Sequence, residues 1–417
     1  MRSVEEHRRI VADLVIARPA RSVRLAEAEG LVLADDVVAP LSLPMFDNSA
    51  MDGYAVLASD VPSGTGLEQP VRLPVAQDIP AGRTDRLTLA PGTAHRIMTG
   101  APLPEGATAV VPVEVTDAGV DVVEIHRAAE PGQHIRRAGE DVTAGTTVLR
   151  AGQVISPAVV GLAAALGFGE LRVVPRLRVL VVSTGSELIK PGSALLPGQI
   201  YESNAVMLAA AVREAGGEVV ATPTSDDDVA AFRAALEPHL DETDLIITSG
   251  GVSAGAYEVV KDAFGDGGGD GRGDGVTGVQ FAKVAMQPGM PQGAGRVRGV
   301  PIVTLPGNPV SSLVSFEVFI RPALRRAMSM PFPDRPRRTA VLTEDLTSPG
   351  GKRQFRRGVY SPGIRDEIGT VTTYGPPASH HLRWLASANC LLEVDEDTTE
   401  LTAGQHVQVW DLRGGEK

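Results

Sequence analysis

This chain has little cysteine, few aromatic residues and no excess of positive charge. Its one cysteine, Cys390, excludes an internal disulfide framework and a zinc site built from several thiolates. Aromatic residues make up 4% of the 417 residues, so the cores must be built from Val, Leu, Ile and Ala. The 39 Lys and Arg against 51 Asp and Glu give a net charge of −12, which disfavours nucleic acid as a partner.

Long apolar runs are absent as well. No run reaches the roughly 18 residues of a membrane-spanning helix, and residues 1–13 lack the apolar segment of a signal peptide. Hydrophobic residues nevertheless make up 43% of the chain, enough to bury cores. We therefore expect a soluble cytoplasmic protein of about three domains, with neither a membrane nor a nucleic acid as partner.

The composition and the spacing of apolar residues change along the chain, and these changes predict four regions. Helical spacing in residues 4–17, continued in 25–33, and a helix in 156–166 before a strand in 171–174 indicate a mixed, discontinuous N-terminal domain. The predicted regions are residues 1–40 with 149–177, a β-rich insert at 41–148, an α/β domain at 178–330 and a C-terminal β domain at 331–417.

The third region alternates buried-strand patterns with helical ones. The predicted strands are 179–183, 218–222, 245–248 and 302–305, and the predicted helices are 205–215, 229–240, 257–264 and 309–328. This alternation predicts a mostly parallel sheet covered by helices on both faces.

Polar and glycine residues follow each of these predicted strands. The candidate ligand-binding residues among them are Ser183, Thr184, Gly185, Ser249, Gly250, Gly251, Ser253, Gly255, Pro306, Gly307, Asn308 and Pro309. Such loops at the carboxyl ends of parallel strands are typical of binding sites for phosphate-bearing ligands. The alternative for any single loop is an ordinary helix cap, for which Ser186, Asp226 and Asn308 are candidates.

Residues 251–255 also match the G-x-S-x-G pattern of a serine hydrolase, with Ser253 as the nucleophile. A triad would require a later acid and a histidine, and the downstream histidines are His380, His381 and His406, in the C-terminal β region. A serine hydrolase is therefore retained as a remote alternative to phosphate binding.

Other polar segments lie outside the α/β region. Residues 46–54, 96–102 and 136–141 are predicted to be turns, and the two of these loops that carry aspartates, 46–54 and 136–141, could instead hold Mg²⁺ together. Lys352, Arg353, Arg356 and Arg357 form either an anion site or a solvated loop. The Gly- and Asp-rich residues 265–275 are expected to be a surface loop.

Taken together, these motifs resemble the MoeA family of molybdopterin molybdenumtransferases, to which the gephyrin E domain is related. The resemblance is carried, in order, by FDNSAMDGYA from Phe46, RIMTGAP from Arg96, GED from Gly139, STGSEL from Ser183, SGGVS from Ser249 and LPGNP from Leu305. It implies a homodimer of four-domain subunits that uses adenylylated molybdopterin and molybdate, releases AMP and requires Mg²⁺.

The resemblance also implies roles for individual residues. The implied catalytic residues are Asp52, Thr99, Asp141, Glu187, Asp226, Glu258 and Lys283. Of these, Asp52, Asp141, Glu187 and Asp226 are the implied Mg²⁺ ligands, whereas Arg357 and Ser379 are implied to bind molybdate. A molybdopterin adenylyltransferase and recipient molybdoenzymes are the implied partners.

Three positions depart from the family pattern. Glu258 stands where the family has aspartate, and Gln287 and Met290 stand where it has lysines. The loss of two cations weakens the predicted anion site. A scaffold paralogue that binds molybdopterin with little or no turnover is therefore the alternative to the transferase.

Overall fold

The computed structural model describes residues 1–61, 69–251, 259–264, 278–365 and 367–413. The chain divides into two compact units, Met1–Arg21 with Val173–Lys417, and Ser22–Arg172. None of the helices in the described part combines the length and the apolar character that crossing a bilayer needs.

A seven-stranded sheet is the centre of the first unit. Its strands, in spatial order, are β16 (Glu218–Ala221), β13 (Arg178–Thr184), β18 (Leu245–Ser249), β22 (Val300–Leu305), β21 (Pro291–Val297) and β19 (Gln280–Lys283), with β17 (Thr224–Ser225) also paired to β13. The first four strands are parallel, and β21 is antiparallel to both of its neighbours. The mostly parallel sheet predicted from the sequence is confirmed.

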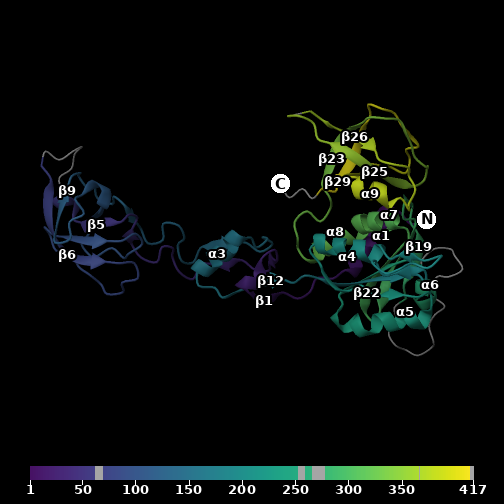
Figure 1. Cartoon of the computed structure of the whole chain (residues 1–417), viewed down its shortest axis with the longest axis horizontal. Helices are drawn as coiled ribbons and strands as arrows, with labels where there is room; N and C mark the ends of the chain where they lie inside the picture. The colour runs from purple at the N-terminus through teal and green to yellow at the C-terminus, as the bar shows by residue number, and fades with distance from the viewer. Residues whose placement is uncertain (62–68, 252–258, 265–277, 366, 414–417) are drawn as a thin grey trace. The chain divides into compact units, whose positions relative to one another are not determined.

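Alternate residues of the strands enter two different cores. In β13, Val179 and Val181 pack with α4 (Asn204–Glu214), α7 (Pro309–Ser315) and α8 (Arg321–Ala327). Leu180 and Val182 pack on the other face with α5 (Val229–Leu236) and α6 (Val259–Phe264). Figure 1 shows these two helical layers on opposite sides of the sheet. A strand buried on both faces is apolar at every position, as the sequence pattern of 179–182 indicated.

Two predicted helices are interrupted. The helix expected over 309–328 consists of α7, a π-helical turn over Phe316–Ile320 and α8. The helix expected over 229–240 is α5 followed by a 3₁₀ segment, Glu237–Glu242. The glycine-containing β21 and the short β19 were not predicted, since their sequences carry little strand propensity.

The first helix, α1 (Val4–Leu14), packs in the core of this unit, with Val4, Val11 and Val15 against α8 and its π-helical turn. The predicted discontinuous N-terminal domain places this helix against residues 149–177 instead. Its apolar stripe shows that it covers a core but not which core, so the sequence could not settle this. Its N-cap, Ser3, accepts a hydrogen bond from the Glu6 N–H at 3.1 Å.

The second unit contains two groups of strands. A three-stranded sheet pairs β1 (Arg21–Arg24) and β2 (Val32–Leu33) with β12 (Glu170–Val174), near α3 (Pro157–Ala165). The helical pattern expected over 25–33 is therefore wrong beyond the short α2 (Leu25–Ala28). The five-stranded sheet of the insert contains β8 (Ala109–Pro112), β5 (Gly53–Val56), β7 (Ala94–Ile97), β6 (Val71–Ile79) and β9 (Val122–Ile125).

The C-terminal region of the first unit is a closed β-structure. Five strands pair in a ring: β25 (Arg353–Ser361), β26 (Gly369–Thr373), β23 (Arg337–Leu342), β29 (His406–Asp411) and β27 (Cys390–Val394). The short β20 (Met286–Gln287) of the α/β region pairs with β25. The β fold expected after residue 331 is confirmed, and Phe355 and Trp410 join the core of the α/β region.

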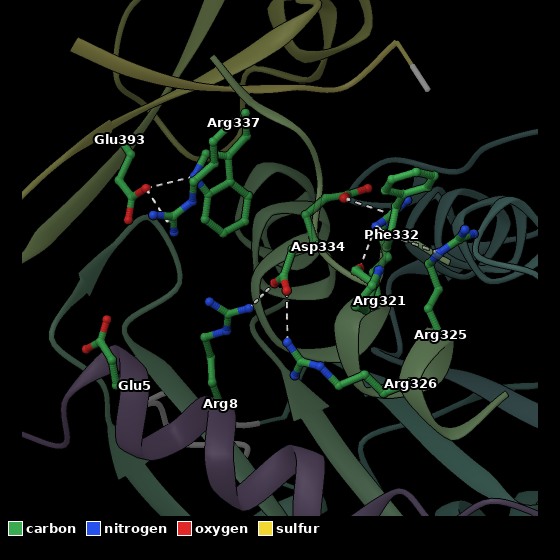
Figure 2. A network of polar contacts seen from close by, with 12 residues as sticks. Glu5, Arg8, Arg321, Arg325, Arg326, Phe332, Asp334, Arg337 and Glu393 are labelled. Atoms are coloured by element: carbon green, nitrogen blue, oxygen red, sulfur yellow. Dashed lines mark hydrogen bonds and ion pairs between the residues drawn. The ribbon is translucent and has the colours of Figure 1, made fainter. Parts of the chain in front are cut away.

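A polar network fastens the connection between the α/β and C-terminal regions (Figure 2). Asp334 accepts from Arg8 of α1 and from Arg326 of α8, the latter at 2.8 Å. Arg321 and Arg325 donate to the backbone carbonyls of residues 331–333. The linker is thereby held by two helices, α1 and α8.

Candidate functional site

The predicted polar loops of the first unit do meet at the carboxyl edge of the sheet. Ser183 and Thr184 end β13, and Ser249 ends the adjacent β18, with all three side chains buried. The N–H of Gly250 donates to the Leu305 carbonyl at 3.1 Å, which ties the end of β18 to the end of β22. These residues were identified from the sequence because parallel strands end at the same edge.

Gly250 shows why glycine is needed in this edge. Its φ is +100°, and a Cβ there would lie 2.7 Å from Thr184 Oγ1 and 2.8 Å from the Thr184 carbonyl oxygen. A Cβ added to Gly307 would lie 3.5 Å from the Cα of Gly250. The three loops are therefore in backbone contact, and a side chain at residue 250 would push them apart.

Sequence reasoning missed the polar residues that join these loops. Glu202 is 5% exposed and accepts from the Ser183 hydroxyl at 2.8 Å and from the Ala205 N–H at 2.7 Å. Asn204 donates to the Ser249 hydroxyl at 2.7 Å and to the Gly307 carbonyl at 2.6 Å. Both stand at the start of α4, away from any recognised motif. The signal that could have found them is the polar sequence Glu-Ser-Asn directly before an apolar helix.

The acids after β13 and β17 have separate tasks. Asp228 is the N-cap of α5 and accepts from the Ala231 N–H at 2.8 Å. Asp227 accepts from the N–H and hydroxyl of Ser186 at 3.2 and 3.1 Å. The capping alternatives for Asp226 and Ser186 are therefore wrong. Asp226 and Glu187 have exposed side chains on loops that follow neighbouring strands.

In the second unit, Asp52 is held by Thr99. The Thr99 N–H and hydroxyl both donate to Asp52 Oδ1, at 2.6 and 2.8 Å. Both bonds lower the pKa of the Asp52 carboxyl below its usual value, and the backbone bond contributes more than the hydroxyl bond. Asp52 is therefore a carboxylate at neutral pH on an exposed residue, and both Thr99 hydrogen bonds go to its Oδ1.

The third predicted loop of this unit, residues 136–141, is bonded to the loop that carries Asp52. Asp47, which sequence reasoning had not singled out, accepts from Arg137 Nη1 at 2.6 Å and from the Ala138 N–H at 2.8 Å. The N–H of Asp141 donates to the Leu43 carbonyl at 3.1 Å. Residues 43–52, 98–101 and 134–142 are thereby tied into one polar surface, on which Asp141 is exposed.

The predicted Mg²⁺ ligands fit a hard cation chemically. Asp52, Asp141, Glu187 and Asp226 all have exposed carboxylates, and oxygen donors are what Mg²⁺ prefers. Asp52 and Asp141 belong to one unit, and Glu187 and Asp226 belong to the other. Within the described residues, no single cluster of three or more His, Cys, Asp or Glu could hold a metal ion.

The predicted molybdate residues lie on and beside a C-terminal loop that reaches the α/β region. Arg357 is 4% exposed and donates to the carbonyls of Ala378 at 3.1 Å, His381 at 3.2 Å and Pro376. The Ser379 carbonyl accepts from the Val310 N–H at 3.1 Å, at the start of α7. In this structure Arg357 therefore organises residues 376–381, and that loop places Ser379 beside residues 306–309.

The remaining predicted residues fall into two groups. Lys283 is exposed at the end of β19, whereas Gln287 and Met290 are half-buried near it. Glu258, Ser253 and Gly255, together with the 265–275 loop, lie outside the described residues. Of the histidines considered for a hydrolase triad, His381 has a buried Nδ1 without a hydrogen-bond partner in the part described.

Comparison with known families accounts for nearly the whole chain. Residues 2–167 match the model of the MoeA N-terminal region (domains I and II), and residues 180–326 match a "Probable molybdopterin binding domain". Residues 339–412 match the MoeA C-terminal region (domain IV). The breaks between the matched segments fall close to residues 178 and 331, where the predicted α/β and C-terminal regions begin.

Individual relatives agree with this assignment. Molybdopterin molybdenumtransferase 2 of Mycobacterium tuberculosis is 68% identical over 99% of this chain and 100% of its own length. Molybdopterin molybdenumtransferase 1 of the same organism is 37% identical, with 98% of each chain covered. A crystal structure of a molybdopterin biosynthesis MoeA protein from Pyrococcus horikoshii superposes with a TM-score of 0.78 at 27% identity, covering 99% of each chain. The chain therefore belongs to the MoeA family.

Proposed function

We propose that this chain inserts molybdenum from molybdate into adenylylated molybdopterin and releases AMP, as a step in molybdenum cofactor biosynthesis. The observation that carries the proposal is the meeting of three polar loops at the carboxyl edge of β13, β18 and β22, inside the segment that matches a molybdopterin-binding model. The names of the relatives that span the whole chain support the same reaction.

The described residues fit distinct roles in that reaction. The loops at Ser183–Thr184, Ser249–Gly251 and Pro306–Pro309 bind the organic substrate through backbone groups, and the buried hydroxyls of Ser183 and Ser249 hold these loops in place. The exposed Lys283 supplies positive charge for an anionic group. Arg357 holds the loop that carries Ser379 toward the molybdate, which has the same tetrahedral charge distribution as a phosphate.

Asp52 and Asp141 of one unit, and Glu187 and Asp226 of the other, are each proposed as Mg²⁺ ligands. A bound Mg²⁺ supplies positive charge that offsets the charge of the phosphate oxygens. Thr99 fixes Asp52 through one oxygen, Oδ1, and so aims the other, Oδ2, away from the protein. Asp227 and Asp228 position the loop around Asp226 by bonding Ser186 and capping α5.

We also propose a cytoplasmic homodimer that receives adenylylated molybdopterin from a molybdopterin adenylyltransferase and delivers cofactor to recipient molybdoenzymes. A reduced, buried Cys390 fits a reducing compartment. The first unit exposes several apolar side chains between residues 195 and 206, which could be covered by a second copy: Leu195, Leu196, Ile200, Tyr201 and Val206. Analytical ultracentrifugation of the full chain tests this assembly.

A single-turnover experiment tests the reaction. The purified protein is mixed with adenylylated molybdopterin, Mg²⁺ and a low concentration of molybdate, and AMP release is followed together with reconstitution of a molybdenum-free recipient enzyme. Both signals are expected. Failure of the protein to bind adenylylated molybdopterin would contradict the proposal.

The second candidate is a molybdopterin-binding scaffold with little or no turnover. Gln287 and Met290, where the family has lysines, are the observation that favours it, because two positive charges are missing beside Lys283. Tight binding of adenylylated molybdopterin without AMP release would support the scaffold, whereas AMP release would show that both substitutions are tolerated.

A further inference from the structure

We propose that Asn204 is a positioning residue of the molybdopterin site, which sets the distance between the loops that end β18 and follow β22. This inference rests on the function proposed above. Asn204 is the first residue of α4, and its side-chain amide spans from Ser249 Oγ (2.7 Å) to the Gly307 carbonyl oxygen (2.6 Å).

The orientation of the Asn204 amide is determined by its partners. The Gly307 carbonyl can only accept a hydrogen bond, so the atom 2.6 Å from it must be Nδ2. A reversed amide would place two oxygens against each other at this distance. Both hydrogens of the amide are therefore used to hold the two loops, which Ser312 Oγ also joins through Ser249 Oγ and the Pro306 carbonyl.

The second observation concerns the acceptor atom of the same amide, Asn204 Oδ1. Asn204 Oδ1 is buried and has no hydrogen-bond partner in the described structure. A buried acceptor without a partner is unfavourable, and a group of this kind in a native protein calls for a functional explanation. Asn204 thus satisfies both of its donors at the loops and leaves its acceptor without a partner in the described structure.

The loops that Asn204 joins are connected to the rest of the edge. Ser249 Oγ lies 3.2 Å from Ser312 Oγ of α7, and Glu202 bonds Ser183 at the end of β13. Residues 202 and 204 thus connect the start of α4 with three neighbouring strand ends. Because Gly250 and Gly307 approach each other closely at the same place, a small shift of either loop changes the shape of the site.

The substitution Asn204→Asp tests the proposal with little change in shape. The aspartate lacks both N–H donors, yet a negative charge in the first turn of a helix is favourable, so α4 itself should not be weakened. We expect Asn204→Asp to raise KM for adenylylated molybdopterin roughly tenfold or more, with kcat changed much less and the thermal midpoint within a few degrees of the unchanged protein.

A structural asparagine provides the matched comparison. Asn389 donates to the Tyr360 carbonyl at 2.9 Å and accepts from the Tyr360 N–H at 2.7 Å, inside the C-terminal β region. Asn389→Asp is expected to lower the thermal midpoint and to leave KM unchanged, which is the opposite pattern. Because Asn204 acts through Ser249, Ser249→Ala should raise KM by a smaller factor in the Asn204→Asp variant than in the unchanged protein.

The outcomes separate the two proposals. If the unchanged protein turns over and Asn204→Asp has the same KM, Asn204 is not a positioning residue and the proposed function stands. The same holds if Asn204→Asp and Asn389→Asp both lower the thermal midpoint and neither raises KM, since the role of Asn204 is then structural. If the unchanged protein neither binds nor converts adenylylated molybdopterin, the proposed function and this inference both fail.

Discussion

Thr99 directs two hydrogen bonds, from its N–H and its hydroxyl, at a single oxygen of Asp52. Asp52 is exposed, so this arrangement adds little to a core. Its effect is to fix the direction of the second carboxylate oxygen and to keep the group ionised. The relationship is the one expected between the Mg²⁺ ligand proposed here and the neighbour that orients it.

Thr99→Val tests this relationship, because it keeps the backbone bond and removes the hydroxyl. We expect the affinity for Mg²⁺ and the rate of AMP release at low Mg²⁺ to fall roughly tenfold, as for other residues that orient metal ligands. Thr93→Val is the matched control, since its hydroxyl bonds only the Ala90 carbonyl of a turn. Equal activity of Thr99→Val and Thr93→Val at every Mg²⁺ concentration would contradict the role of Thr99.

Gly250→Ala is expected to abolish tight binding of molybdopterin. The new Cβ would meet two Thr184 oxygens within 2.8 Å, in addition to the strain of a φ of +100°. Gly192→Ala separates these two effects, because Gly192 has a φ of +92° and no atom within 4 Å of the new Cβ. Binding measured by fluorescence titration should be lost in the first variant and retained in the second.

Arg357→Lys is expected to loosen residues 376–381. A lysine cannot reproduce the three hydrogen bonds that the planar guanidinium makes to backbone carbonyls. Hydrogen exchange in 376–381 should quicken, and the molybdate concentration needed for half-maximal insertion should rise. Arg383→Lys is the control, since Arg383 is exposed and stacks on Trp384 of the adjacent α9 (Leu382–Ser387). Unchanged exchange in Arg357→Lys would show that the loop is held by other contacts.

His7 makes the first unit sensitive to acid. Burial, with a smaller contribution from Arg2, lowers the pKa of His7 to about 4, and its Nε2 has no partner in the described structure. Since the folded pKa lies below the unfolded one, stability is fully present above about pH 6.5 and is lost as the pH falls toward 4. Protonating His7 in the folded protein costs on the order of 3 kcal/mol.

His7→Leu should remove this part of the acid sensitivity. The difference in thermal midpoint between pH 7.5 and pH 4.5 is expected to be smaller in the variant than in the unchanged protein. His406→Leu, at an exposed position of β29, should leave the difference as it is. An identical pH dependence of the His7→Leu and unchanged proteins would show that other groups control the acid limb.

Glu317→Gln tests the buried ion pair behind the linker. Arg335 donates to both carboxylate oxygens of Glu317 at 2.8 and 2.9 Å, with the side chains 3% and 5% exposed. Leaving the buried guanidinium with weaker partners should lower the free energy of unfolding by about 3 kcal/mol in urea titrations. Asp334→Asn, which breaks the half-exposed pairs in Figure 2, should cost less than about 1 kcal/mol. Equal costs would contradict the importance of burial.

Local patterns were sufficient for the elements that lie between two cores. The apolar runs at 179–182 and 245–247 predicted strands, and their alternation with helices predicted the parallel sheet, because each pattern depends on neighbours in the chain. The strand-end loops followed from the same reasoning, since parallel strands end together. This is why Ser183, Ser249 and Gly307 could be named before the structure and were found joined in it.

The distant residues that hold these elements in place became known only from the folded chain. The placement of α1 against α8, the pairing of β20 with β25 and the burial of Arg357 under its loop depend on contacts between segments far apart in the chain. Asn204 and Asp47 carry no motif, and their importance comes from the atoms that folding brings within 3 Å of them. Local patterns in the chain were enough to identify the family, the sheet and most of the polar loops. The contacts that hold those loops in place were set by packing, because hydrogen bonds depend on position in space rather than on spacing in the chain.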